Sequence, residues 1–232
     1  METVSMKISI ISLFPEVFAS YFQSSILGRA ISNGIVEMEY ISLREFGKGV
    51  HKSVDDRPFG GGKGQVIQCE PVLKAIRSIQ TPTSKIYMLA PSGRVFQQAM
   101  AHDLAKESHL ILLCGHYEGF DYRIEEYCDG VLSIGDYVLS GGELAAMVVS
   151  DAIIRLIPGV ISEGSTEEES FENGLLEYPQ YTQPAVFEGK EVPEVLRSGN
   201  HAKIKIYRQE QAIERTAKTR PDLMALYERR GK

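Results

Sequence analysis

The stretch at residues 133–143 reads SIGDYVLSGGE and runs directly into LAAMVVSDAIIRLIPG, which ends at Gly159. Three glycines fall within these eleven positions, between an apolar strand pattern and a long apolar helix pattern. Because glycine lets another backbone or a ligand approach closely, this pattern indicates a turn shaped around a bound molecule. The alternative is an ordinary strand-to-helix turn with Asp136 as the helix cap.

Extended apolar runs alternate with helical patterns through the first two thirds of the chain. This alternation predicts an α/β domain with a mainly parallel sheet and helices on both faces. In such sheets, ligands bind beyond the carboxyl ends of the strands. The expected strands are residues 7–13, 35–43, 85–89, 109–114 and 130–134, and the expected helices are 16–23, 70–79, 96–106 and 143–156.

Three of the expected strands are followed by similar loops. MLAPSGR (88–94), LLCGHYEGFD (112–121) and the stretch at 133–143 each place glycine or proline with small residues after an apolar run. Together they are expected to line one pocket. Loops of this kind offer main-chain N–H and C=O groups, which suit an adenine edge and a ribose better than a triphosphate.

The glycine-rich segment VDDRPFGGGKGQ (54–65) does not fit a phosphate-binding P-loop. Gly64 stands where that motif needs serine or threonine after the lysine, and Arg57 stands where it needs its first glycine. The segment remains either a surface turn with local ion pairs or a loop that contacts substrate through Asp55 and Arg57.

Charge is distributed unevenly along the 232 residues. The net charge is −6, but residues 180–232 hold eleven Lys and Arg against seven Asp and Glu, a charge of +4, which leaves −10 for residues 1–179. Between Arg197 and Arg220 there are seven basic and two acidic residues. This cluster is either a solvated helix face or a surface that binds phosphate groups.

The chain is expected to divide into three parts. Residues 1–160 form the α/β domain, 161–179 a flexible acidic linker, and 180–232 a basic domain of short helices. Three cysteines without metal-type spacing argue against a disulfide framework or a zinc site. No apolar run approaches the roughly 20 residues of a membrane helix, so a cytoplasmic protein is expected.

Seven motifs then reveal a resemblance that covers nearly the whole chain. In order they are LFPEVF, VDDRPFGGGKG, GHYEGFD, SIGDYVLSGGE, IPGV, SFENGLLEYPQYTQP and VPEVLRSGNHAKI. The chain resembles the bacterial tRNA (guanine-N1)-methyltransferase family. This resemblance implies a SPOUT-type domain with a trefoil knot, a homodimer, S-adenosylmethionine as methyl donor, and methylation of guanosine 37 of tRNA. It also allows for Mg²⁺ as a second cofactor.

The resemblance assigns a donor pocket to the three loops. The implied cofactor-binding residues are Leu89, Ala90, Pro91, Gly115, Tyr117, Glu118, Ile134, Gly135, Asp136, Tyr137, Val138, Leu139, Gly141 and Gly142.

Two catalytic residues are implied in the same way. Guanine N1 carries a proton, so its attack on a methyl group needs a base. The family has aspartate for this role before an SF pair, and here Glu169 stands at that position, with Glu167 and Glu168 as neighbouring alternatives. Arg155 is implied to stabilise negative charge on guanine O6. Without the resemblance, a helical ion pair with Asp151 is the simpler interpretation of Arg155.

The resemblance also assigns the tRNA contacts to two regions. They are Asp55 and Arg57 in the glycine-rich segment and His201, Lys203, Lys205 and Arg208 in the basic one, with Arg197 and Arg215 as further phosphate partners. Two rival functions are left open: another knotted RNA methyltransferase, or a catalytically silent RNA-binding protein.

Overall fold

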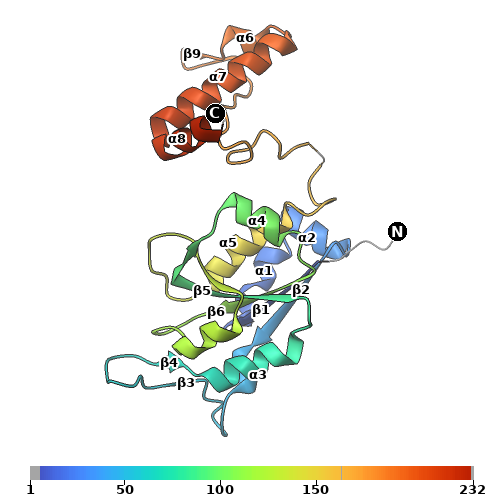
Figure 1. Ribbon diagram of the computed structural model, residues 1–232. Coiled ribbons are helices and arrows are strands. Elements are labelled where there is room, and N and C mark those ends of the chain that lie inside the picture. Colours follow the sequence, from blue (N-terminus) through green and yellow to red (C-terminus); the bar gives the residue numbers. More distant parts are fainter. Residues whose placement is uncertain (1–5, 163, 231–232) are drawn as a thin grey trace. The chain divides into compact units, whose positions relative to one another are not determined.

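The computed structural model describes residues 6–162 and 164–230, and these two ranges belong to two compact units. The first unit is built on a sheet of five strands in the order β2-β1-β6-β5-β7 (Figure 1). Every pairing in this sheet is parallel, which confirms the predicted α/β class. The strands are β1 (Met6–Ser12), β2 (Val36–Ser42), β5 (Ser84–Val95), β6 (His109–Cys114) and β7 (Gly130–Ser133).

Helices cover both faces of the sheet (Figure 1). One face packs against α1 (Ala19–Phe22), α2 (Ser25–Ser32), α4 (Gln98–Leu104) and α5 (Glu143–Ile154), and the other packs against α3 (Cys69–Ile79). The central strand β6 is buried along its whole length. This explains its unbroken apolar sequence, because a strand covered on both faces has no solvent-facing side.

Strand β5 is longer than the sequence pattern predicted. Its expected end at Leu89 was wrong, because the strand continues through the first loop to Val95. Leu89 and Arg94 both pair with Leu132 of β7, so the residues between them bend outward. A Cβ atom on Gly93 would lie 2.6 Å from the Leu132 backbone, so glycine is what allows β5 and β7 to approach this closely.

The helical regions also differ from their predictions. The helix expected at 16–23 is split into a 3-10 turn, Pro15–Val17, and the short α1. Helix α2 was not predicted at all. In the second unit, the tail expected to form short helices contains the 19-residue α7 (His201–Thr219), which begins where the Asn200 side chain accepts a hydrogen bond from Lys203 N.

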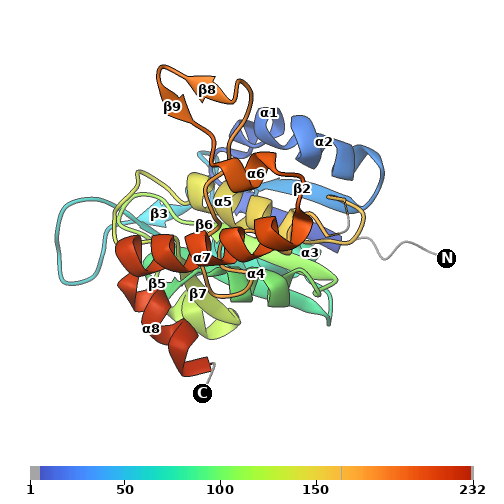
Figure 2. The ribbon, with the colours of Figure 1, turned by 90° about the horizontal axis from the view of Figure 1, so that it is seen from above.

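The second unit is formed by helices and one short hairpin. Helices α6 (Glu194–Arg197) and α8 (Pro221–Arg230) accompany α7, with α7 and α8 side by side (Figures 1 and 2). The hairpin of β8 (Val186–Phe187) and β9 (Lys190–Glu191) projects from the side of this unit that holds α6 (Figure 2).

Part of the acidic segment expected as a linker packs against α7 within this second unit. Leu175 is buried, and Leu176 N donates a hydrogen bond of 2.8 Å to Oγ1 of the buried Thr216. The compact unit therefore begins at Gly164 rather than at residue 180. In the described part of the chain, no helix has the length and apolar character needed to cross a membrane.

Candidate active site

The three glycine-containing loops meet around one cavity of about 530 Å³. It lies beyond the carboxyl ends of β5, β6 and β7, where an α/β sheet is expected to bind its ligand. The N-terminal end of α5 forms part of its wall, through Gly142 and Ala145. All of the residues implied for the donor pocket line this cavity except Asp136.

The glycine pair at the start of α5 sets the shape of the cavity. Gly142 N donates a hydrogen bond of 2.8 Å to Gly115 O, which joins this turn to the end of β6. A Cβ atom at position 142 would lie 2.7 Å from Cys114 Cα and 2.9 Å from Gly115 N. Any larger residue would push the helix away from the strand. The residue preceding α5 is Gly142, which corrects the alternative in which Asp136 caps the helix.

Glu143 connects this turn to the first strand. Its Oε1 accepts a hydrogen bond of 2.7 Å from Ser12 Oγ, and Ser12 Oγ in turn accepts one from Phe14 N at 2.9 Å. Its other carboxylate oxygen lies against Gly141. Sequence reasoning missed this role, because Ser12 and Glu143 are 131 residues apart. Glu143 therefore links the glycine turn to the end of β1.

The third loop, at residues 133–143, is held in shape by hydrogen bonds between neighbouring residues. Gly135 has a φ of +144°, and Ser133 Oγ accepts from Gly135 N at 3.2 Å. Tyr137 OH donates to Ile134 O at 3.2 Å. Tyr137 and Val138 remain 54% and 83% exposed, so this loop presents both main-chain groups and apolar side chains to an incoming ligand.

The second loop forms the opposite rim and is tied to the glycine-rich segment. Glu118 N donates to Gln65 O at 3.0 Å, and Asp121 N donates to Ile67 O at 2.9 Å. This contact brings the hairpin of β3 (Asp55–Asp56) and β4 (Val66–Ile67) beside the cavity wall. Asp55 and Arg57 thus lie at the base of a loop anchored to the rim.

Two titratable groups near the cavity have shifted pKa values. Burial, reinforced by the charge of Glu143, raises the pKa of the Cys114 thiol well above its ordinary value, so this cysteine stays protonated and unreactive. The Arg123 guanidinium holds the pKa of the Asp121 carboxyl well below its usual range. Asp121 is therefore ionised and fixed next to the rim, with Arg123 Nη2 2.6 Å from its Oδ2.

Several polar residues of the cavity were not predicted. Ser92, His116, Tyr122 and Glu125 also line it. His116 and Tyr122 stand in the same GHYEGFDY run as the predicted Tyr117 and Glu118, so their place in that loop was the signal that could have identified them. Within the described ranges, no cluster of three or more His, Cys, Asp or Glu side chains could hold a metal ion.

Arg155 lies at the other end of α5 from the cavity. It directly follows Ile154, and its backbone N donates to Asp151 O at 3.2 Å. At 1.5 Å per residue, about 20 Å of helix separates it from Gly142. A single chain therefore does not bring Arg155 to the cavity.

The acidic residues of the second unit have different surroundings. Glu168 Oε2 accepts a hydrogen bond of 2.6 Å from Tyr178 OH and lies 3.4 Å from Arg208 Nη1. Glu169 is half-buried, and its backbone N donates to Thr166 O. The carboxylate of Glu168, one of the two alternatives to Glu169, is therefore bound by Tyr178 and Arg208.

The residues predicted to contact tRNA in the basic region share the first half of α7. His201, Lys203 and Lys205 are exposed, whereas Arg208 is half-buried, with its guanidinium 4.6 Å above the Tyr178 ring. His201, Lys205 and Arg208 are spaced four and three residues apart, which places them on one face of the helix. Lys205 and Arg208 make this face of α7 positively charged.

The fold and the cavity define the class of protein: an α/β protein with a cavity lined by glycine-containing loops at the carboxyl edge of a parallel sheet. The chain belongs to the family described as tRNA (Guanine-1)-methyltransferase TrmD, whose family model matches residues 6–226. This finding confirms the resemblance seen in the motifs and, with it, the SPOUT-type fold.

Curated relatives agree with this assignment over nearly their full length. The chain is 53% identical over 225 residues to the tRNA (guanine-N(1)-)-methyltransferase of Ruminiclostridium cellulolyticum, covering 94% of this chain and 96% of the relative. It is 50% identical over 222 residues to that of Mycoplasma pneumoniae, covering 96% of each chain. With that of Ureaplasma urealyticum it shares 51% identity over 223 residues, 96% of this chain and 98% of the relative.

Proposed function

We propose that this protein transfers the methyl group of S-adenosylmethionine to N1 of guanosine 37 of tRNA. The observation that carries the proposal is the 530 Å³ cavity, formed by the three loops to which the motifs assigned the donor, in a chain of this family. The proposed substrate implies a cytoplasmic protein. A requirement for Mg²⁺ stays a prediction, and the roles proposed for the protein's residues do not depend on it.

The cavity residues fit S-adenosylmethionine. When bound, this cofactor supplies an electrophilic methyl group on a positively charged sulfur. The main chain of the loops at 89–91 and 134–139 offers hydrogen bonds to an adenine edge and a ribose. Gly142 allows the start of α5 to lie directly against the end of β6. The positive end of the α5 dipole borders the cavity and favours a carboxylate such as that of the cofactor.

The transfer also requires a base and a cation. In this proposal, Glu169 removes the proton from guanine N1 as the new N–CH₃ bond forms, and Arg155 stabilises the charge that develops on O6. The neighbouring Glu168 has a structural role in the second unit, because its carboxylate accepts from Tyr178 and pairs with Arg208.

A homodimer would bring Arg155 to the cavity. Leu144, Val148, Asp151 and Arg155 follow one another at helical spacing on one face of α5, and Leu144 and Val148 are 57% and 48% exposed. Tyr21, which donates to Asp151, extends this apolar face and is 40% exposed. If two copies packed their α5 faces antiparallel around a two-fold axis, Arg155 of each would lie near the start of the other's α5.

Replacing Val148 with glutamate should therefore produce a monomer. A charge buried without a partner costs at least about 3 kcal/mol, or about 10²-fold in dimer affinity. Sedimentation equilibrium should show the mass falling to that of one 25.8 kDa chain, with methyl transfer lost in parallel. Leu226→Glu, at the half-exposed Leu226 of α8, is the matched control and should leave the dimer intact. A wild-type monomer, or a dimer that survives Val148→Glu, would contradict this arrangement.

The proposed reaction is tested directly with an unmodified tRNA transcript and S-adenosylmethionine. Methylation at N1 removes a Watson–Crick donor, so reverse transcription of the product should stop one nucleotide before position 37. A stop elsewhere, or methylation without any stop, would favour another RNA methyltransferase. Binding of tRNA without methyl transfer would favour a silent RNA-binding protein.

A further inference from the structure

The second unit contains a cavity of its own, of about 620 Å³, which the proposed reaction does not use. It lies between the loop at 178–185, helix α6 and the first half of α7. This volume is within the range of sites that bind small organic molecules or parts of larger ligands.

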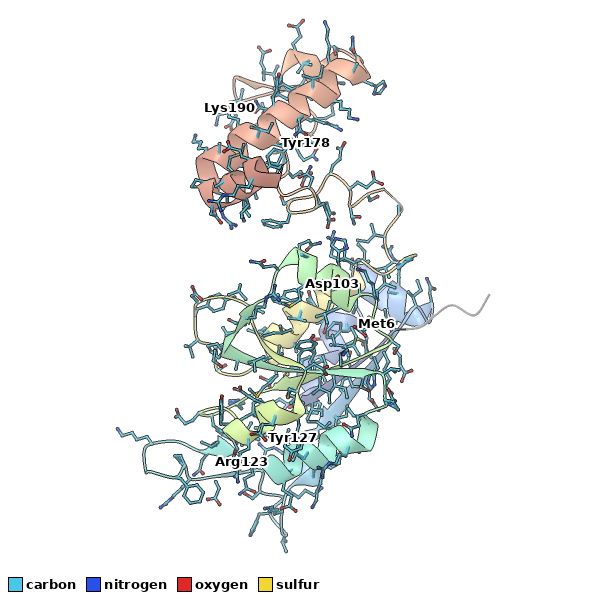
Figure 3. The ribbon with its side chains drawn as sticks, in the orientation of Figure 1. Met6, Asp103, Arg123, Tyr127, Tyr178 and Lys190 are labelled. Atoms are coloured by element: carbon cyan, nitrogen blue, oxygen red, sulfur yellow. The ribbon has the colours of Figure 1, made fainter. Side chains whose placement is uncertain are left out.

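One wall of this cavity is held in place by a network of contacts. The Arg208 guanidinium lies over the Tyr178 ring, 4.6 Å from its centroid. Tyr178 itself lies next to α7 (Figure 3). Both side chains share Glu168 Oε2 as their acceptor. Arg208 Nε is buried and has no hydrogen-bond partner among the described residues. Arg208 therefore helps to form the cavity wall through its contacts with Tyr178 and Glu168.

The remaining lining combines three kinds of chemistry. Leu196 and Ile204 form an apolar part, and Gln180 and Gln183 supply amide donors and acceptors. Tyr181 lines the cavity and is 48% exposed, so part of this aromatic residue is accessible to a ligand.

A cation is available at the same cavity. Arg197 lines it and forms an ion pair with Glu191, with Nη2 3.2 Å from Oε2. The Arg197 side chain is 41% exposed and that of Glu191 is 63% exposed. Such a surface pair contributes little stability, so a phosphate group can replace the carboxylate at small cost.

We propose that this cavity binds one unpaired nucleotide of an RNA strand, with its base stacked on Tyr181 and its phosphate on Arg197. An aromatic face, nearby amides and a cation are the groups that recognise splayed-out nucleotides in single-stranded RNA. The exposed Lys203 and Lys205 of α7 extend the positive surface for the neighbouring phosphates. This inference rests on the proposed function, because it takes the RNA to be the tRNA substrate.

The test compares variants of the full-length chain in binding an unmodified tRNA transcript. Because stacking of a base on an aromatic ring is worth about 1–3 kcal/mol, Tyr181→Ala should weaken affinity by about 5- to 150-fold. Its slope of log affinity against log salt should stay unchanged, since no charge is lost. Tyr181→Phe keeps the ring and should retain the affinity. Phe187→Ala removes another exposed aromatic ring of the same unit, outside the cavity lining, and should have no effect.

Arg197→Ala should behave differently from Tyr181→Ala. It removes one phosphate contact, so the salt slope should fall by about 1. For all variants, calorimetric binding of S-adenosylmethionine, which the proposal assigns to the other unit, and the thermal unfolding midpoint report whether the chain is still folded.

The outcomes separate this inference from the proposed function. If the wild-type chain neither binds nor methylates tRNA, the proposed function fails. If it does both, and Tyr181→Ala binds tRNA as tightly as wild type, the nucleotide site alone is overturned. Tyr181-dependent binding of free adenosine 5′-monophosphate that is tighter than binding of tRNA would also overturn it, since the cavity would then be a mononucleotide site.

Discussion

Replacing Glu169 with glutamine is expected to slow methyl transfer by about 10²- to 10⁴-fold, which is the usual contribution of a general base. The amide keeps the size of the side chain but cannot take the proton from guanine N1. Cofactor affinity should be unchanged, because the cofactor cavity lies in the first unit and Glu169 in the second. Single-turnover rates with an unmodified tRNA transcript, together with calorimetry of S-adenosylmethionine, measure the two effects separately.

Neighbouring acids provide the matched controls for this prediction. Glu167→Gln should leave the rate near that of wild type. Glu168→Gln should weaken the contacts with Tyr178 and Arg208, and so change KM more than kcat. Glu169→Asp shortens the side chain by one methylene and gives the aspartate that the resemblance implies for this role, so it should stay active. If Glu168→Gln caused the larger loss in kcat and Glu169→Gln none, the role of base would pass to Glu168.

Replacing Gly142 with alanine is expected to abolish cofactor binding and to lower methyl transfer by at least about 10²-fold, the effect of a displacement of about 1 Å at a reacting centre. The backbone of Gly142 has φ −81° and ψ −4°, which alanine can adopt. The obstacle is steric, since the new Cβ would lie 2.7 Å from Cys114 Cα and 2.9 Å from Gly115 N. Relief requires the start of α5 to move, which stretches the bond from Gly142 N to Gly115 O.

The adjacent glycine is the control for this second prediction. A Cβ atom at Gly141 would meet a side-chain oxygen of Glu143 rather than backbone, and it would lie 3.4 Å from Gly115 O. The Glu143 carboxylate can shift at the cost of its bond to Ser12. Gly141→Ala should therefore reduce cofactor affinity much less than Gly142→Ala. Calorimetric titration with S-adenosylmethionine gives the affinities, and circular dichroism shows whether each variant is folded. Equal affinity of Gly142→Ala and wild type would show that the cofactor does not bind in this cavity.

Local patterns were sufficient for much of the first unit. The apolar run at 109–114 was predicted to be a strand and is β6, and the pattern from residue 143 was predicted to be a helix and is α5. The three loops after the strands were expected to share a pocket, and they line one cavity. These predictions succeed because parallel strands carry their ends to one edge of a sheet, so the order of elements alone brings the loops together.

The same patterns could not show how β5 bends beside β7. The pairing of both Leu89 and Arg94 with Leu132 depends on two strands meeting across about forty residues of chain, and apolar periodicity contains no such information. The assignment of individual cofactor and tRNA contacts, and the knot implied by the resemblance, stay predictions.

The amino-acid sequence by itself determined the α/β class, the parallel sheet, the position of the glycine turn and, through its motifs, the family. The helix predicted at 143–156 already places Arg155 about 20 Å from this turn, because a helix rises 1.5 Å per residue. Only the tertiary structure decided that Glu143 holds this turn through Ser12 and that Glu168 is engaged by Tyr178 and Arg208. The physical reason is the range of the interactions. Periodicity and turn chemistry act between residues a few positions apart, whereas hydrogen bonds and ion pairs join residues that meet only after the chain has packed.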